Sequence, residues 1–263
     1  MNDRFTMKGR NAIVTGATRG IGLAIARGFL ESGATVTLCG RKQEGVDVAL
    51  ADLSGNANAA HSDTDHSGSV LGLAAHVGQV EDIERLVAAA EERFGPVDTL
   101  VNNAGTNPYY GPIAESEDWA WDKTMDVNLR GPYLLSRRLA VKMMAGDGGS
   151  IVNISSIAGL DALPAQGIYS VTKAGLIMLT KVMAREMGAS GVRVNCICPG
   201  VIRTKLSAAL WEDDKAAKEF LARKALGRFG EVDELVGAAI YFASDASSFT
   251  TGAVLQVDGG MVI

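Results

Sequence analysis

The chain has few of the residues that direct a protein toward disulfide, metal or nucleic-acid chemistry. Its 263 residues include three cysteines, three histidines and six prolines. Three cysteines are too few and odd in number, which excludes a disulfide framework as the basis of the fold. The formal net charge of -5 at pH 7 provides no basic surface for nucleic acid or anionic lipid. We therefore expect a small molecule as partner, and neither nucleic acid nor a membrane.

Long apolar segments are also missing. The opening stretch MNDRFTMKGR lacks the apolar core of a signal peptide, and no later apolar run is long enough and free enough of charge to span a bilayer. Nevertheless 47% of the residues are hydrophobic, enough for a large buried core. No proline-rich linker or block of charge divides the chain. We expect a single cytoplasmic domain over residues 1–263.

The three cysteines and one histidine-containing segment are the only candidates for metal binding. Cys39, Cys196 and Cys198 lie in apolar, strand-like runs, which predicts buried and reduced thiols. Four possible ligands occur together in HSDTDHSG, namely His61, Asp63, Asp65 and His66. That segment is rich in glycine, serine and asparagine, a composition typical of a solvated loop. We expect no metal site.

Short apolar runs alternate with amphipathic segments along the chain. Strands are expected at 11–17, 34–41, 70–78, 97–105, 149–156, 191–200 and 253–260. Helices are expected at 20–33, 44–53, 82–95 and 121–144, from about Tyr169 onward, and at 232–244, with a helical excursion at about 205–226. Strands that alternate with helices through short connections form a parallel sheet. The predicted fold class is α/β: a single-domain Rossmann-type, doubly wound parallel sheet with helices on both faces.

A glycine-rich turn follows the first expected strand. Gly16, Gly20 and Gly22 occur in TGATRGIG, between that strand and the first helix. Glycines at this place allow the backbone to approach a pyrophosphate, and the N-terminus of the helix offers free N–H groups to it. Tight turns need glycine as well, and the spacing is not the GxGxxG of the standard dinucleotide motif. The position of the turn favours a bound dinucleotide.

A tyrosine precedes a lysine by four residues in GIYSVTKAG. Tyr169 and Lys173 lie on one face of the expected helix, one turn apart. An amphipathic helix with a half-buried tyrosine and an exposed lysine would show the same spacing. The pair indicates a functional role only in combination with the other motifs.

The motifs together resemble the classical short-chain dehydrogenase/reductase family. They are TGxxxGxG, NNAG at Asn102 to Gly105, a serine ahead of YxxxK, and PG at Pro199, in family order over nearly the whole chain. The resemblance implies four catalytic residues: Asn128, Ser156, Tyr169 and Lys173. Ser156 is preferred over its neighbour Ser155 because it stands thirteen residues before Tyr169, the usual gap in the family.

The implied roles suit a transfer of hydride to a ketone. Tyr169 is the expected proton donor, and the charge of Lys173 together with that of an oxidised nicotinamide should lower the pKa of its phenol toward the working range. Ser156 would hold the substrate oxygen, and Asn128 would hold a water that passes protons to Lys173. The structural alternative for Asn128 is a side chain that satisfies backbone groups at a helix kink.

The resemblance also implies a set of cofactor contacts. The expected residues are Gly16, Thr18, Arg19, Gly20, Ile21, Gly22, Arg41, Val77, Asn103, Ala104, Gly105, Tyr169, Lys173, Pro199, Gly200, Ile202 and Thr204. The second strand ends in TLCGRK, which lacks the acid that binds a ribose 2′-hydroxyl, and Arg41 and Arg19 could instead bind a 2′-phosphate. We expect NADP(H) rather than NAD(H). The position before Val77, often Asp in the family, is His76 here.

We expect the segments around Tyr169 to form the walls of the substrate pocket. They are TNPYYGPI, GLDALPAQG and the excursion that carries Leu206, Leu210 and Trp211, which are mainly apolar and aromatic. NPYYGPI and HVG resemble the carbonyl-reductase branch, so the expected reaction interconverts a ketone and a secondary alcohol.

Two other functions stay open. Reduction of 3-oxoacyl groups on acyl carrier protein would use cations on the helix after Asn128, namely Arg130, Arg137, Arg138 and Lys142. A non-catalytic dinucleotide sensor is the remote alternative, since all four catalytic positions are filled.

Relatives pair the helices that carry Asn128 and Tyr169 across subunits, which implies a homotetramer.

Overall fold

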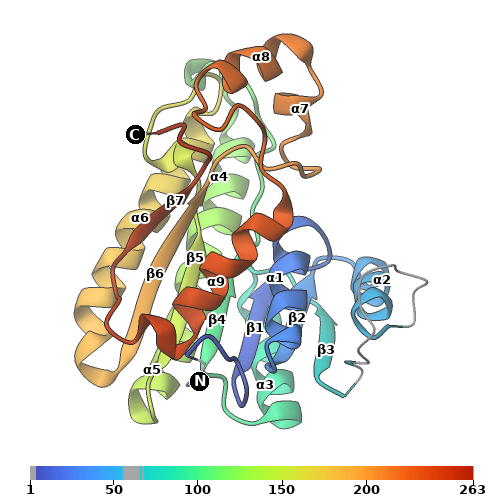
Figure 1. Cartoon of the computed structure of the whole chain (residues 1–263), viewed down its shortest axis with the longest axis vertical. Helices are drawn as coiled ribbons and strands as arrows, with labels where there is room; N and C mark the ends of the chain where they lie inside the picture. Colours follow the sequence, from blue (N-terminus) through green and yellow to red (C-terminus); the bar gives the residue numbers. More distant parts are fainter. Residues whose placement is uncertain (1–3, 56–65, 67, 263) are drawn as a thin grey trace.

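The computed structural model describes residues 4–55, 66 and 68–262 of the chain (Figure 1). In these residues seven parallel strands form one sheet in the order β3-β2-β1-β4-β5-β6-β7. The strands are β1 Asn11–Thr15, β2 Thr35–Gly40, β3 Val70–Ala74, β4 Thr99–Asn102, β5 Gly149–Ile154, β6 Val192–Pro199 and β7 Val254–Val257. The predicted fold class is confirmed. No described helix combines the length and the apolar composition of a membrane span.

Helices cover both faces of the sheet (Figure 1). They are α1 Gly20–Glu31, α2 Gln43–Leu53, α3 Val80–Phe94, α4 Asp118–Met125, α5 Gly131–Ala145, α6 Gly167–Met187, α7 Ala208–Trp211, α8 Asp214–Ala222 and α9 Val236–Ala243. Successive strand residues point to opposite faces. Val14 therefore packs in a cluster with Phe29 of α1 and Phe242 of α9, whereas Ile13 packs in another with Leu86 of α3 and Leu139 of α5.

The strand order reverses at β1, and this places the functional motifs. β1 pairs with β2 on one side and with β4 on the other, so the chain leaves their carboxyl ends in opposite directions. In an open α/β sheet such a switch point leaves a crevice outside the carboxyl ends of the strands. The glycine-rich turn follows β1, and the NNAG turn begins at the end of β4. Helices α7 and α8 lie at the same end of the sheet (Figure 1).

One expected helix is interrupted in the structure. Instead of one helix over 121–144, α4 is followed by a π-helical turn at Asp126–Arg130 and then by α5. The sequence explains the break, because Pro132 has no N–H and cannot give the Asn128 carbonyl its α-helical hydrogen bond. The turn carries Asn128, whose side chain is completely buried.

A chain of buried hydrogen bonds joins the sheet to two helices. Asn102 of β4 donates to Ser136 of α5 and to Asn153 of β5, each at 2.8 Å. Asn153 in turn donates to Thr180 of α6 at 2.8 Å. Asn102 and Asn153 thus tie the neighbouring strands β4 and β5 to each other and to α5 and α6.

We predict that Asn102→Ala lowers the free energy of unfolding by about 1–3 kcal/mol, because two buried groups lose their hydrogen-bond donor. Urea unfolding followed by circular dichroism measures the change. Asp147→Ala, at an exposed residue with no partner among the described side chains, is the control and should change the value by less than about 0.5 kcal/mol. Equal effects of the two variants would contradict a structural role for the network.

Candidate active site

The glycine-rich turn and the NNAG turn lie in direct contact. A Cβ on Gly22 would stand 2.4 Å from Asn103 Nδ2 and 2.6 Å from the Gly16 carbonyl oxygen. Gly16 itself has a φ of +63°, and a Cβ there would stand 2.7 Å from Ala104 Cα. All three distances are shorter than a side chain tolerates, so these two positions require glycine.

Hydrogen bonds hold the two turns together. Asn103 Nδ2 donates to the carbonyl oxygens of Thr15 and Gly16 at 2.9 and 3.1 Å. The Thr15 hydroxyl accepts the N–H groups of Asn103 and Ala104 at 3.0 and 3.1 Å. The chain between β1 and α1 therefore has a fixed shape beside the N-terminus of α1, where a phosphate is favoured.

Exposed cations border this turn. Arg19, Arg41 and Lys42 are exposed, and no described carboxylate pairs with any of them. Thr18 packs against Gly40 at the end of β2, where a Cβ would stand 2.4 Å from its methyl group. A close-packed glycine turn beside unpaired guanidinium groups fits the phosphates of a dinucleotide.

Lys173 is buried beside the Tyr169 ring. Its Nζ lies 5.5 Å from the ring centroid and donates to the Ile154 carbonyl oxygen, at the end of β5, at 2.8 Å. The side chain is only 3% exposed, and burial lowers the pKa of the ammonium to about 8. Ser155 donates its hydroxyl to the Lys173 carbonyl at 2.8 Å. The Ser155 hydroxyl is therefore engaged in a hydrogen bond to α6.

Ser156 and Tyr169 face one another across the pocket. The Ser156 oxygen accepts the Ala158 N–H at 3.1 Å, and its hydroxyl lies close enough to the phenol of Tyr169 to influence the pKa of that phenol. Burial raises the pKa of that phenol above its ordinary value, against the lowering effect of Ser156. In the protein chain by itself, loss of hydration is the largest influence on this pKa and exceeds the lowering effect of Ser156. The expected lowering by Lys173 together with an oxidised nicotinamide stays a prediction.

The Asn128 side chain is occupied by its own surroundings. Its Oδ1 accepts the Thr106 N–H at 2.8 Å, and its Nδ2 donates to the Thr106 carbonyl at 2.9 Å and to Thr172 at 3.2 Å. The amide thus fixes the segment after NNAG against α6. A Cβ on Gly105 would lie 3.7 Å from both Asn128 Oδ1 and Lys173 Nζ, so the three residues are close together.

Several other expected cofactor residues make close contacts with neighbouring segments. A Cβ on Gly20 would lie 3.5 Å from the Thr204 methyl group, and one on Gly200 would lie 2.7 Å from Asp258 Cα. Val77 is buried against Gly131 at the start of α5. Ile202 is buried and packs beside Gly230.

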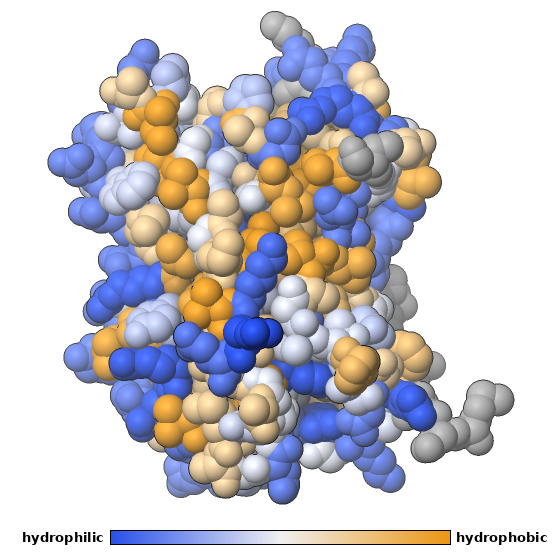
Figure 2. Space-filling model, turned by 90° about the vertical axis from the view of Figure 1, so that its left-hand side faces the viewer, coloured by the Kyte–Doolittle hydropathy of each residue, from blue (hydrophilic) through white to orange (hydrophobic). Residues whose placement is uncertain are grey.

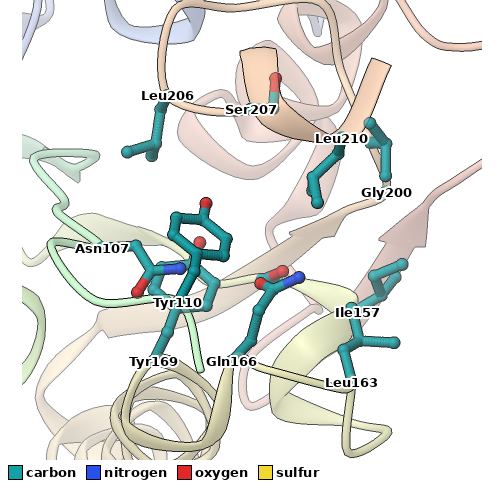
Figure 3. Close-up of a pocket in the computed structure, with 12 residues that line it drawn as sticks. Asn107, Tyr110, Ile157, Leu163, Gln166, Tyr169, Gly200, Leu206, Ser207 and Leu210 are labelled. Atoms are coloured by element: carbon teal, nitrogen blue, oxygen red, sulfur yellow. The ribbon is translucent and has the colours of Figure 1, made fainter. Parts of the chain in front are cut away.

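A pocket opens above Tyr169 (Figure 3). Its lining comes from the segment after NNAG, from the segment before α6, and from the start of the excursion. The lining residues are Asn107, Tyr110, Ser156, Ile157, Leu163, Gln166, Tyr169, Gly200, Val201, Leu206, Ser207 and Leu210. All three segments expected from the sequence contribute. Trp211 does not, because it stacks on the Arg203 guanidinium and donates to Ser207.

The thiols lie behind the site. The Cys196 and Cys198 Sγ atoms are 3.9 Å apart on β6, and all three cysteines are buried and free, as expected. Among the described residues no three His, Cys, Asp or Glu side chains gather in a way that could hold a metal ion. His61, Asp63 and Asp65 of the histidine-containing segment lie outside the described residues.

Sequence reasoning identified the pocket segments but missed individual residues within them. Asn107 and Gln166 line the pocket beside the Ser156 and Tyr169 pair, and Thr106 and Thr172 fix Asn128. Lys224, buried after α8, donates to the Val201 carbonyl at 3.1 Å and packs on Phe229. None of these residues belongs to a motif, so only their positions in the fold reveal them.

Comparison with known proteins agrees with this architecture. A family model described as enoyl-(acyl carrier protein) reductase matches residues 16–262. Dehydrogenase/reductase SDR family member 4 from Bos taurus is 40% identical over 260 residues, which is 99% of this chain and 90% of that protein. The protein of the same name from Homo sapiens is 38% identical, with the same shares covered.

Solved structures show the same fold over almost the whole chain. A gluconate 5-dehydrogenase from Burkholderia cenocepacia, in complex with NADP and tartrate, is 35% identical with a TM-score of 0.89, covering 98% of this chain and 97% of that one. A short-chain type dehydrogenase/reductase from Mycobacterium ulcerans is 35% identical with a TM-score of 0.90, covering 97% and 90%. The chain therefore belongs to the short-chain dehydrogenase/reductase family and is an oxidoreductase that acts on alcohols and carbonyl compounds.

Proposed function

We propose that the protein is an NADP(H)-dependent reductase of ketones, and in reverse a dehydrogenase of secondary alcohols. The observation that carries this proposal is the pocket in which Ser156 meets Tyr169 while Lys173 lies buried beneath the ring. The pocket is linked to the glycine turn through Thr204, which lies near Gly20 and shares a hydrogen bond with Ser207 of the pocket lining. A proton donor, an oxygen-binding hydroxyl and a buried cation are the groups needed for carbonyl reduction.

The raised pKa of Tyr169 keeps its phenol protonated at neutral pH, ready to give the proton to a ketone oxygen. Ser156, oriented by the Ala158 N–H, can donate its own hydrogen to the developing alkoxide. When Tyr169 gives up its proton, the Lys173 ammonium stabilises the phenolate. A nicotinamide dinucleotide, when bound, supplies the hydride in reduction and accepts it in oxidation.

The glycine turn, Asn103 and Ala104 would hold the dinucleotide, with Lys173 and Thr204 at its nicotinamide end. Arg19 and Arg41 would hold a 2′-phosphate, because both are exposed and have no described carboxylate partner. The second strand ends at Gly40 without an acid for a ribose hydroxyl. Two structures of similar proteins hold NADP, those from Burkholderia cenocepacia and Beutenbergia cavernae.

The alternative substrate, a 3-oxoacyl group on acyl carrier protein, has less support. Its recognition would need an exposed basic surface on α5 and the turn before it. Three of the four cations there are already paired with carboxylates of this chain: Arg130 with Asp126, Arg138 with Glu84 and Lys142 with Glu91. Arg137 stacks on Tyr133. The remote alternative, a non-catalytic sensor, does not account for the assembled catalytic residues.

We further propose that residues 205–226 act as a lid, because Leu206, Ser207 and Leu210 form the pocket wall at the carboxyl end of the sheet. A homotetramer is supported by apolar side chains that α5 and α6 leave exposed, such as Val141 at 61% and Met178 at 58%. Figure 2 shows apolar surface gathered across the face on which α6 lies. Pairing of these helices between subunits would cover it.

Tyr169→Phe should reduce kcat for ketone reduction by at least about a thousandfold, because the proton donor is lost while little volume changes. Stopped-flow or steady-state oxidation of NADPH measures the rate. Fluorescence titration with NADPH serves as the control and should give a Kd within about twofold of the wild type. Retention of most of the wild-type kcat would contradict the proposed mechanism.

The pH dependence of reduction should follow Lys173. Below its pKa of about 8 the ammonium is charged and stabilises the phenolate that forms when Tyr169 gives up its proton. Above that pH the charge is lost, so kcat/KM for reduction should decrease as pH rises through about 8. In Lys173→Arg the cation persists, so this decrease should move above pH 10 even if the overall rate is lower. An unchanged profile in the variant would assign the decrease to another group.

Arg41→Asp should lower kcat/KM for NADPH by about tenfold or more. The reason is that a charged hydrogen bond worth about 1.5–3 kcal/mol is lost and a carboxylate then faces the 2′-phosphate. The rate with NADH should stay the same or improve. Lys8→Asp changes the net charge equally at an exposed residue near the amino end of β1, and it is the matched control. An unaltered NADPH to NADH ratio in Arg41→Asp would overturn the assignment of Arg41.

A further inference from the structure

We propose that Arg203 and Trp211 are positioning residues that hold one wall of the pocket in place for the ketone. The pocket wall consists of Leu206, Ser207 and Leu210. Neither Arg203 nor Trp211 is among the residues that line the pocket, so both act through the wall and not by contact with the substrate. The inference rests on the proposed function and names a contact outside the pocket on which the affinity for the ketone depends.

The pocket wall receives little support from the core. Ser207 directly precedes α7, a single turn in which none of the four described residues is buried. A helix this short is not stable by itself in water, so it keeps its place through contacts with other segments. Leu206 is 47% exposed, although it faces the pocket. The position of the wall therefore depends on the contacts at the ends of α7.

Arg203 is fixed to the part of the chain that leads into α9. Its backbone N–H donates to the Gly230 carbonyl oxygen at 2.9 Å, and its Nε lies 3.3 Å from Glu231 Oε1. Its Cζ lies 5.8 Å from the ring centroid of Phe229, which is buried. Glu231 caps the 3₁₀ turn Val232–Leu235, which continues into α9 against the core. The guanidinium thus has a fixed place on the body of the protein.

Trp211 contacts the same guanidinium from α7. The Arg203 Cζ lies 5.4 Å from the centroid of the Trp211 ring. Arginine stacks well on aromatic rings because its guanidinium is planar and weakly hydrated. One cation therefore joins the last residue of α7 to the buried Phe229 ring.

Ser207 connects this stack to the pocket. The Trp211 Nε1–H donates to Ser207 Oγ at 3.2 Å, and the Ser207 hydroxyl donates to the Ile202 carbonyl oxygen. Thr204 Oγ1 lies 3.0 Å from the same hydroxyl. In Figure 3 Ser207 and the two leucines of the wall lie across the pocket from Tyr169. Movement of the Trp211 ring would therefore displace residues that face the substrate.

The stack, and not the ion pair, carries the contact. The side chains of Arg203 and Glu231 are 50% and 59% exposed, and exposed ion pairs contribute little to stability. A lysine at position 203 would keep the positive charge but lose the planar group. Arg203→Lys therefore removes the stack and leaves a cation beside Glu231.

Loss of the stack should change binding and leave the chemistry intact. Without it the wall is in place in a smaller fraction of the molecules, which reduces the apparent affinity for the ketone by that fraction. Tyr169 and Lys173 lie on α6, and Ser156 follows β5, so the wall does not carry them. The expected signature is a raised KM for the ketone at an unchanged kcat.

Steady-state kinetics with NADPH and the best of a series of ketones, such as 3-hexanone and acetophenone, measures this signature. Arg203→Lys and Trp211→Leu should each raise KM for the ketone by about three- to tenfold, with kcat within about twofold of the wild type. The double variant should show the KM of the weaker single variant, because all three variants lose one and the same contact. Trp211→Phe keeps an aromatic ring for Arg203 and should show a smaller increase than Trp211→Leu.

Arg93→Lys is the matched control for the loss of an arginine stack. Arg93 also lies over an aromatic ring, that of Phe94, at the end of α3 and outside the pocket. This variant should leave both KM and kcat unchanged. Fluorescence titration with NADPH should give the wild-type Kd for every variant, which shows that each is folded.

Tryptophan fluorescence tests the contact without turnover. The chain has three tryptophans, so Trp119→Phe together with Trp121→Phe leaves Trp211 as the remaining one. In that background Arg203→Lys should increase the quenching of Trp211 by acrylamide, because the guanidinium no longer covers the indole ring. Unaltered quenching would overturn the stack as the contact that holds α7.

The outcomes separate this inference from the proposed function. If the wild type oxidises neither NADPH nor NADH with any ketone of the series, the proposed function fails, and the ketone-binding wall fails with it. If the wild type reduces ketones but Arg203→Lys and Trp211→Leu keep the wild-type KM, the proposed function stands and the positioning role is overturned. A lower kcat at an unchanged KM would overturn it as well, since the two residues would then affect the chemistry.

Discussion

The buried hydrogen bonds from Asn102 through Asn153 to Thr180 set the position of everything that the site contains. They connect β4 and β5 with α6, while the bond from Asn102 to Ser136 adds α5. Apolar packing alone would allow a helix to slide along a sheet, because it has no direction. Satisfied polar networks in a core specify one arrangement. The depth of Lys173 and the place of Asn128 both follow from this fixed spacing.

Burial gives the tyrosine and the lysine opposite tendencies within one helix turn. Each side chain loses hydration, so the phenol holds its proton more firmly and the ammonium releases its proton more easily. Burial thus favours the neutral state of both groups over the charged state. The Ile154 carbonyl and the Ser156 hydroxyl oppose this effect of burial by favouring the ammonium and the phenolate.

The sequence predicted the sheet, its helices and the motif residues, because strands that are buried on both faces and turns that need glycine leave strong local patterns. It predicted one helix over 121–144 and offered a kink at Asn128 only as an alternative, because Pro132 permits a break while the π-helical turn itself depends on packing around Asn128. The sequence also did not identify Gln166 and Asn107, because what distinguishes them is side-chain amides without hydrogen-bond partners among the described residues of the folded chain. The rise in the Tyr169 pKa that burial causes could not be predicted either, because burial is not visible in a motif.

The π-helical turn at Asp126–Arg130 has a consequence for how the family can vary in length. A π-helical turn holds one residue more than an α-helical turn, and each residue of a helix rotates the chain by about 100°. Loss of one residue here would turn the whole of α5 about its axis, which would carry Ser136 and Leu139 away from the core. Point substitutions in this segment affect single contacts, whereas a deletion changes the phase of the helix. Descendants of this sequence can therefore exchange its residues far more readily than they can lose one.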